Sequence, residues 1–125
     1  MLTNGFFLQN DILGSAMNAA VVRNDIINNN IANVDTPNFK RSSVKFESIL
    51  NDLLKDYKKT GRINLSNASP IIQKEYTNFS YRIDGNNVDI ESEMVDLYKN
   101  SVRYDVLTSS IINNYKRINA VLSTR

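Results

Sequence analysis

The most regular pattern in the chain is a heptad repeat near the C-terminus, where apolar positions follow alternating steps of four and three residues. This spacing is typical of a helix that packs along another helix. We predict one helix over residues 90–123, about 50 Å long at a rise of 1.5 Å per residue. The repeat, named here the C-terminal row, consists of Ile90, Met94, Leu97, Ser101, Tyr104, Thr108, Ile111, Tyr115, Ile118 and Leu122. A second apolar stripe consists of Val95, Tyr98, Val102 and Ile112.

Charged residues at the start of this predicted helix suit its dipole. Asp89 stands at the N-cap position, where a carboxylate accepts a hydrogen bond from a free backbone N–H. Glu91, Glu93 and Asp96 follow within the first two turns. A metal site built from these four carboxylates is the alternative, but their spacing lacks the alternating order of a calcium loop. Helix-start electrostatics is therefore the simpler interpretation.

A similar repeat predicts a helix over residues 9–33, which contain no proline and no strand-like alternation. This N-terminal row consists of Leu13, Met17, Ala20, Asn24, Ile27, Ile31 and Val34. A narrower stripe on another side of the same helix consists of Ala19, Val22 and Ile26. A helix with two apolar stripes requires more than one neighbour.

The middle of the chain has weaker patterns. Apolar residues at helical spacing predict a short helix near 45–57, and the pattern loosens after Gly61. Alternation over 79–83 predicts a strand, and Asp84-Gly85 reads as a turn. The fold class is therefore mainly α, with a small extended or hairpin element between the helices. We expect three segments: 1–40, 41–85 and 86–125.

The apolar positions are too many for two long helices, one short helix and a strand or two to cover. Apolar stripes left open on a monomer indicate partners. A compact bundle that closes on itself is the alternative, and these patterns alone do not decide between them. Asn113 and Asn114 lie off the C-terminal row, so both are expected to tolerate an added charge.

Composition narrows the function further. The chain has no cysteine and no histidine, so thiolate metal sites and the commonest general base are absent. Its net charge is +2 and no long block of like charge occurs, which disfavours a nucleic-acid binder. No apolar run is long enough to span a membrane, and the first residues lack the basic segment of a secretory signal. No catalytic motif or cofactor fingerprint is found.

The segment that follows the first predicted helix has a distinctive turn signal. Pro37 fixes φ at the first central position of a turn, and Asn38 tolerates the positive φ that a type II turn requires at the second. Proline also ends the preceding helix. We predict a rigid corner at Thr36-Pro37-Asn38, with Phe39 swung back as an anchor.

This corner resembles the signature of the flagellar axial proteins, the rod, hook and hook-associated subunits. The matching residues are Asn30, Ala32, Asn33, Thr36, Pro37, Phe39 and Lys40, while Asn38 replaces the usual glycine. The start of the last helix is similar to the C-terminal signature of the same family. Its matching residues are Asn87, Val88, Asp89, Glu93 and Met94. The preceding Asp84-Gly85 and the later Arg103-Tyr104 look more like the proximal rod subunits.

The resemblance implies a fold and a function. The terminal helices would pack as a coiled-coil-like pair, with a variable outer region between them. The chain would be a structural rod subunit of the flagellar basal body, would carry no catalytic activity, and would be exported by the flagellar apparatus without a cleaved signal. Expected partners are further copies, other rod subunits, the basal-body adaptor protein and the membrane ring; no cofactor, nucleic acid or direct membrane insertion is expected. A sibling rod subunit and a coiled-coil export chaperone are the alternatives.

Overall fold

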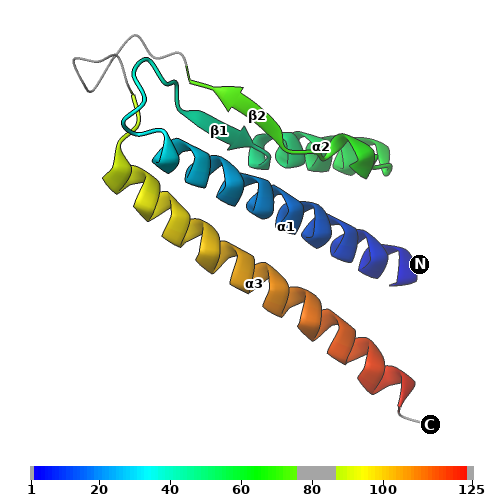
Figure 1. Cartoon of the computed structure of the whole chain (residues 1–125). Coiled ribbons are helices and arrows are strands. Elements are labelled where there is room, and N and C mark those ends of the chain that lie inside the picture. The colour runs from blue at the N-terminus through cyan, green and yellow to red at the C-terminus, as the bar shows by residue number, and fades with distance from the viewer. Residues whose placement is uncertain (1, 76–86, 124–125) are drawn as a thin grey trace.

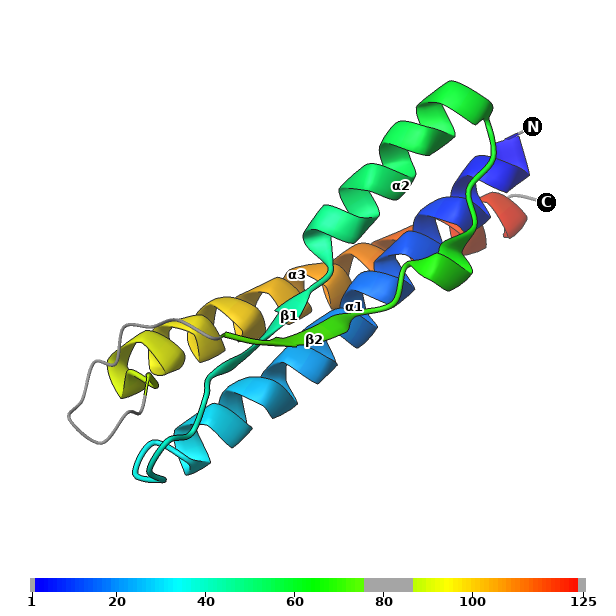
Figure 2. The same ribbon diagram turned by 90° about the horizontal axis from the view of Figure 1, so that it is seen from above.

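Two long antiparallel helices form the frame of the molecule. The computed structural model describes residues 2–75 and 87–123. Helix α1 (Leu2–Ala32) and helix α3 (Ile90–Leu122) lie side by side, and both chain ends lie at the same end of the pair (Figures 1 and 2). The helices are closest near the corner after α1 and diverge toward the termini (Figure 1). The prediction of a mainly helical chain with long terminal helices is confirmed.

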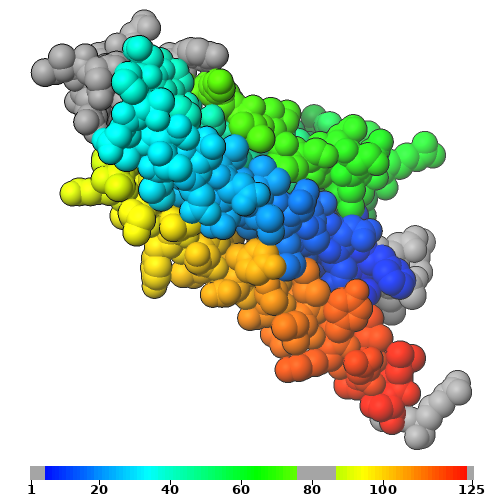
Figure 3. Space-filling view, in the orientation of Figure 1, coloured from blue at the N-terminus to red at the C-terminus, as the bar shows by residue number. Residues whose placement is uncertain are grey.

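A smaller layer covers α1 on the side away from α3. It contains β1 (Ser42–Lys45), α2 (Glu47–Thr60), the short 3-10 helix η1 (Leu65–Asn67) and β2 (Ile71–Lys74). The strands pair antiparallel, with Ser42 opposite Lys74 and Lys45 opposite Ile71. In Figure 3 α3 runs along one edge of the molecule, and the outer layer emerges from the opposite side of α1. One face of α1 is therefore covered by the chain itself, whereas α3 reaches the outer layer through side chains such as Arg103.

The apolar core lies between α1 and this outer layer. Ala19, Phe46 and Ala68 are buried together, with Ala16 and leucines of α2 and η1 packed against them. Ala19 belongs to the narrower stripe predicted on the first helix. The prediction that this helix needs two neighbours is confirmed, because one side of α1 meets the outer layer and another side meets α3.

Several element boundaries match the sequence predictions. Helix α3 spans almost the predicted range, and the Asp89 side chain accepts a hydrogen bond of 3.0 Å from the backbone N–H of Glu91. Helix α2 confirms the short helix expected near 45–57 and ends at Gly61, whose φ is +68°. The left-handed conformation there favours glycine because no Cβ is present to clash.

Other boundaries differ from the predictions. The predicted start of the first helix at residue 9 is wrong, since α1 begins at Leu2. The segment before residue 9 contains no proline, and a helix tolerates Gly5 at a cost of about 1 kcal/mol relative to alanine. The predicted strand at 79–83 and the turn at Asp84-Gly85 lie outside the described residues. The observed strands have four residues each, too few for alternation to be visible in the sequence, and they enclose α2 instead of forming a hairpin.

The predicted corner is present. The backbone N–H of Phe39 donates to the carbonyl of Thr36 at 3.3 Å, which closes the turn around Pro37 and Asn38. Asn38 has a φ of +59°, so the predicted positive φ is confirmed. Phe39 is half-buried, while Pro37 and Asn38 are exposed. The corner therefore owes its shape to local backbone geometry.

We expect Asn38→Val to reduce the free energy of unfolding by about 1–2 kcal/mol, because a β-branched side chain is strained at positive φ. Asn38→Gly should match or slightly exceed the stability of the natural chain. Urea unfolding of the purified variants measures both effects. Equal stability of the two variants would show that the corner imposes no requirement on this residue.

Candidate functional site

A network of polar side chains connects the end of α1, the start of β1 and the start of α3. We name it the polar junction; its members are Asn30, Arg41, Ser42, Glu75, Asn87, Glu93 and Asp96. Asn30 is fully buried, and its Nδ2 donates to the Ser42 carbonyl at 2.8 Å and to Glu93 Oε2 at 3.1 Å. Its Oδ1 accepts from the Ser42 backbone N–H at 3.0 Å. One amide thus connects three elements, and each of its polar atoms has a partner.

Arg41 is the charged centre of the polar junction. Its Nε donates to Glu93 Oε1, one terminal nitrogen donates to Glu75 Oε1 at 2.8 Å, and the other donates to Asp96 Oδ2 at 3.1 Å. Burial lowers the pKa of Arg41, but the hydrogen bond to Glu93 and the charges of the three carboxylates outweigh it and raise the pKa. A guanidinium suits this place because its planar fork reaches several carboxylates at once.

Asn87 connects the end of β2 to the polar junction. Its Oδ1 accepts from the backbone N–H of Arg41 at 2.8 Å, and its Nδ2 donates to the Glu75 carbonyl at 3.1 Å. The backbone N–H of Glu75 in turn donates to the Arg41 carbonyl at 2.8 Å. The chain is therefore tied to itself on both sides of the undescribed segment 76–86.

The acidic residues lie in the first two turns of α3, as predicted, but two of them also have partners outside the helix. Asp89 caps the helix, but Glu93 is fully buried against Arg41, and Asp96 is paired with the same guanidinium. Sequence reasoning missed Arg41 because nothing marks which basic residue approaches a distant helix. Within residues 2–75 and 87–123, no group of acidic side chains is arranged to hold a metal ion.

The remaining signature residues lie around the polar junction. Val88 is buried beside Asn87, and the Asn33 side chain donates to the carbonyl of Asn29 at 2.8 Å. Ala32 and Thr36 are exposed at the corner. Met94 is 54 % exposed, although its neighbour Glu93 is fully buried. The signatures therefore supply both a buried network and exposed surface.

The two predicted rows differ in how deeply their side chains are buried. All helical members of the N-terminal row are buried or half-buried. In the C-terminal row, four members are half-buried: Leu97, Thr108, Ile111 and Ile118. Six members are exposed: Ile90, Met94, Ser101, Tyr104, Tyr115 and Leu122. The contact of α3 with α1 therefore uses only part of the C-terminal row, whose role in assembly stays a prediction.

The buried residues of α3 are polar, and each directly precedes a member of the C-terminal row. They are Glu93, Asn100 and Asn114. Asn100 Nδ2 donates to the carbonyl of Ala20 at 2.8 Å, and Asn114 Nδ2 donates to Asn10 Oδ1 at 2.9 Å. The expectation that Asn114 tolerates a charge is thus wrong, since only 6 % of it is exposed.

This arrangement leaves an unusual amount of apolar surface on α3. Among the described residues, eleven of the sixteen exposed large apolar side chains belong to this helix. Tyr98 is 73 % exposed and Val121 is 77 % exposed. A surface of this kind on a single chain marks a protein interaction site. No described helix is long and apolar enough to cross a membrane.

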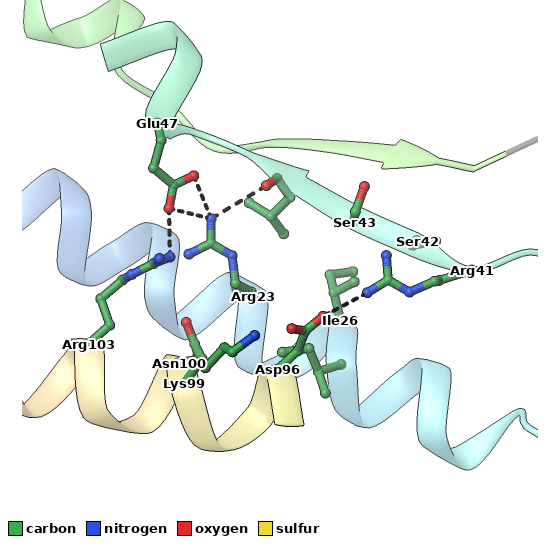
Figure 4. A pocket seen from close by; sticks show the side chains of 12 residues that line it. Arg23, Ile26, Arg41, Ser42, Ser43, Glu47, Asp96, Lys99, Asn100 and Arg103 are labelled. Atoms are coloured by element: carbon green, nitrogen blue, oxygen red, sulfur yellow. Dashed lines mark hydrogen bonds and ion pairs between the residues drawn. The ribbon is translucent and has the colours of Figure 1, made fainter. Parts of the chain in front are cut away.

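A second charged contact joins α1, α2 and α3. A terminal nitrogen of Arg23 donates to both carboxylate oxygens of Glu47 at 2.8 Å, and Arg103 donates to Glu47 Oε1 at 2.7 Å (Figure 4). Burial raises the pKa of Glu47, but its own backbone hydrogen bond and the two arginines lower the pKa below its ordinary value. The Glu47 carboxylate therefore forms ion pairs with two arginines.

Comparison with known proteins decides what this assembly of helices belongs to. A family model described as "Flagella basal body rod protein" matches residues 11–40, which include most of α1 and the corner. The flagellar basal body rod protein FlgB of Borrelia hermsii is 34% identical over 137 aligned positions, covering 95% of this chain and 98% of the relative. The chain belongs to the FlgB family of flagellar basal body rod proteins.

Other FlgB proteins support the same conclusion. FlgB of Bacillus subtilis is 30% identical over 118 positions, covering 89% of this chain and 90% of the relative. FlgB of Borreliella burgdorferi is 36% identical over 116 positions, covering 81% and 85%. As a FlgB family member, the chain is a structural subunit of the proximal rod of the flagellar basal body and assembles with other basal-body components.

The polar junction connects the two segments that resemble the axial-protein signatures. Asn30 belongs to the first and Glu93 to the second; they are 63 positions apart and their side chains are hydrogen-bonded. Asn87 of the second segment binds the backbone of Arg41, which directly follows the first. The two segments therefore meet in the fold through side-chain hydrogen bonds.

Proposed function

We propose that the exposed apolar surface of α3, with the C-terminal row at its centre, forms the contacts between neighbouring subunits in the rod. The observation that carries this proposal is the inverted burial of the helix. Polar Glu93, Asn100 and Asn114 face α1, whereas Met94 and Tyr115, each one residue further on, are 54 % and 56 % exposed. A helix that buries polar groups and exposes apolar ones is suited to a packed assembly, where the exposed groups meet neighbouring helices.

The energetics favour this proposal. Fully burying a large apolar side chain contributes about 1.5–3 kcal/mol, and half of that for one already half-buried. Several such residues on each subunit can offset the entropy lost on association. The polar contacts inside the subunit, by contrast, contribute specificity more than stability, because their groups must first leave water. Many parallel helix contacts would make the stiff shaft that transmits torque.

We further propose a division of labour along the chain. Residues 1–40 and 86–125 would form the axial part, while 41–85 would form a variable outer part; the position of the outer layer on the side of α1 away from α3 supports this division. Partners would be further copies of the chain, other rod subunits, the basal-body adaptor protein, the membrane ring and the export apparatus. Export would occur without a cleaved signal.

Chemical labelling tests the proposed interface. The chain contains no cysteine, so single cysteines can be placed at Met94, Tyr115 and, as a control in α2, exposed Lys58. We expect all three to react with a maleimide at similar rates in the purified subunit. In assembled basal bodies, Met94→Cys and Tyr115→Cys should react roughly tenfold more slowly, since a packed interface excludes water and reagent. If assembly leaves the labelling rates of Met94→Cys and Tyr115→Cys unchanged, the proposed interface is contradicted.

A further inference from the structure

A cleft lies where β1 and the start of α2 cross the pair of long helices. Its volume is about 330 Å³, and it is lined by side chains of α1, β1, α2 and α3 (Figure 4). It lies on the side of the helix pair that carries β1, and its charged lining has no part in the apolar surface proposed above. We name it the basic cleft.

The charges along the basic cleft are unevenly distributed. Its cations are Arg23, Arg41, Lys99 and Arg103, and its anions are Glu47 and Asp96. Arg41 binds Asp96 and two further carboxylates, so negative charge is in excess at its end of the cleft. Arg23 and Arg103 share the single carboxylate of Glu47. Lys99, on the same side, makes no hydrogen bond or ion pair with the described residues.

The lining also holds a polar atom without a partner. Asn100 is 4 % exposed, and its Oδ1 has no hydrogen-bond partner among the described residues. In Figure 4 this oxygen points from α3 toward the side of the cleft where Arg23 and Arg103 lie. A buried acceptor left unpaired costs free energy. Among the described residues of one subunit, the end of the basic cleft that holds Arg23, Lys99 and Arg103 thus has only the Glu47 carboxylate.

We infer that the basic cleft binds an acidic side chain, aspartate or glutamate, presented by a neighbouring subunit of the rod. A carboxylate placed between Lys99 and Arg103 would balance the positive charge that exceeds Glu47 at this end of the cleft, and a guanidinium binds a carboxylate through two parallel hydrogen bonds. The cleft has room for one or two side chains, which fits a protein segment. Charge pairs of this kind fix orientation and select partners, whereas apolar packing supplies affinity.

Reversal of one charge tests this inference. Lys99→Glu should leave the unfolding midpoint of the purified subunit unchanged, because Lys99 has no partner within the described residues. Incorporation into basal bodies should fall by at least about tenfold, since two like charges would meet in the interface. The matched control is Lys116→Glu, an exposed lysine of the same helix outside the cleft, which should incorporate normally. Normal incorporation of Lys99→Glu, or equal loss from both variants, overturns the inference.

A second measurement identifies the partner. A photo-crosslinking amino acid at position 99 in assembled basal bodies should capture a peptide of another subunit that contains aspartate or glutamate. Replacing that acidic residue by lysine should then restore incorporation of Lys99→Glu. A captured peptide without an acidic residue, or no restoration by the exchanged charge, refutes the inference. The maleimide experiment on Met94 and Tyr115 is independent, so the proposed apolar interface can stand or fall separately.

Discussion

Glu93→Ala should reduce the free energy of unfolding of the purified subunit by about 3 kcal/mol, the cost of removing one partner from a buried ion pair. Glu93 is fully buried, and its carboxylate binds both Arg41 and Asn30. Without this carboxylate, the Asn30 amide loses an acceptor. Arg41 then keeps its ion pairs with Glu75 and Asp96. Urea unfolding at neutral pH measures the loss.

Glu91→Ala provides the matched control. Glu91 lies in the same first turn of α3, so both substitutions remove one favourable interaction with the helix dipole. Glu91 is exposed, and its replacement should cost no more than about 0.5–1 kcal/mol. Glu93→Gln should fall between the two, because it keeps an acceptor oxygen and loses the charge. If Glu93→Ala and Glu91→Ala unfold at the same urea concentration, the polar junction contributes nothing to stability.

Three consecutive residues of α3 should respond in three different ways to the same new charge. Asn113 is exposed, Asn114 is buried against Asn10, and Tyr115 is an exposed member of the C-terminal row. Replacement of each by Asp adds one negative charge at almost the same height on the helix. The comparison therefore distinguishes the effect of a charge in solvent from its effect on folding and from its effect on assembly.

Asn114→Asp should reduce the free energy of unfolding by about 2–4 kcal/mol, because a carboxylate there loses the donor that binds Asn10 and becomes a buried unpaired charge. Tyr115→Asp should change it by less than about 0.5 kcal/mol, as surface substitutions usually do, yet abolish rod assembly and motility. Asn113→Asp should leave stability and motility near those of the natural chain.

Export has to be measured beside motility, to separate loss of secretion from loss of assembly. Urea unfolding of each purified variant gives the stability, and electron microscopy of basal bodies gives the assembly. If cells with Tyr115→Asp are motile, the C-terminal row is not part of the interface between subunits. Equal defects in all three variants would mean that charge on this helix matters irrespective of the face that carries it.

The sequence by itself determined the local structure and, through its signatures, the family. The extent of α3, the cap at Asp89 and the positive φ of Asn38 could all be predicted, because each depends on neighbours within about one helical turn. The excess of apolar positions on the last helix also predicted that the chain needs partners. These features follow from backbone sterics and from the period of apolar residues, which are written along the chain.

Only the tertiary structure decided which side of α3 meets α1. Asn114 reads as a surface residue in the sequence, and Glu93 reads as a helix-start charge, yet both are buried, as is Asn100, for which no pattern gives a signal. A polar side chain is buried when a distant partner satisfies it, and no local pattern reveals that Arg41 is that partner for Glu93. The C-terminal row is the stronger pattern in the sequence, but most of its members lie on the part of α3 that is exposed in one subunit. Burial depends on which segments meet in space, and that is decided by long-range contacts.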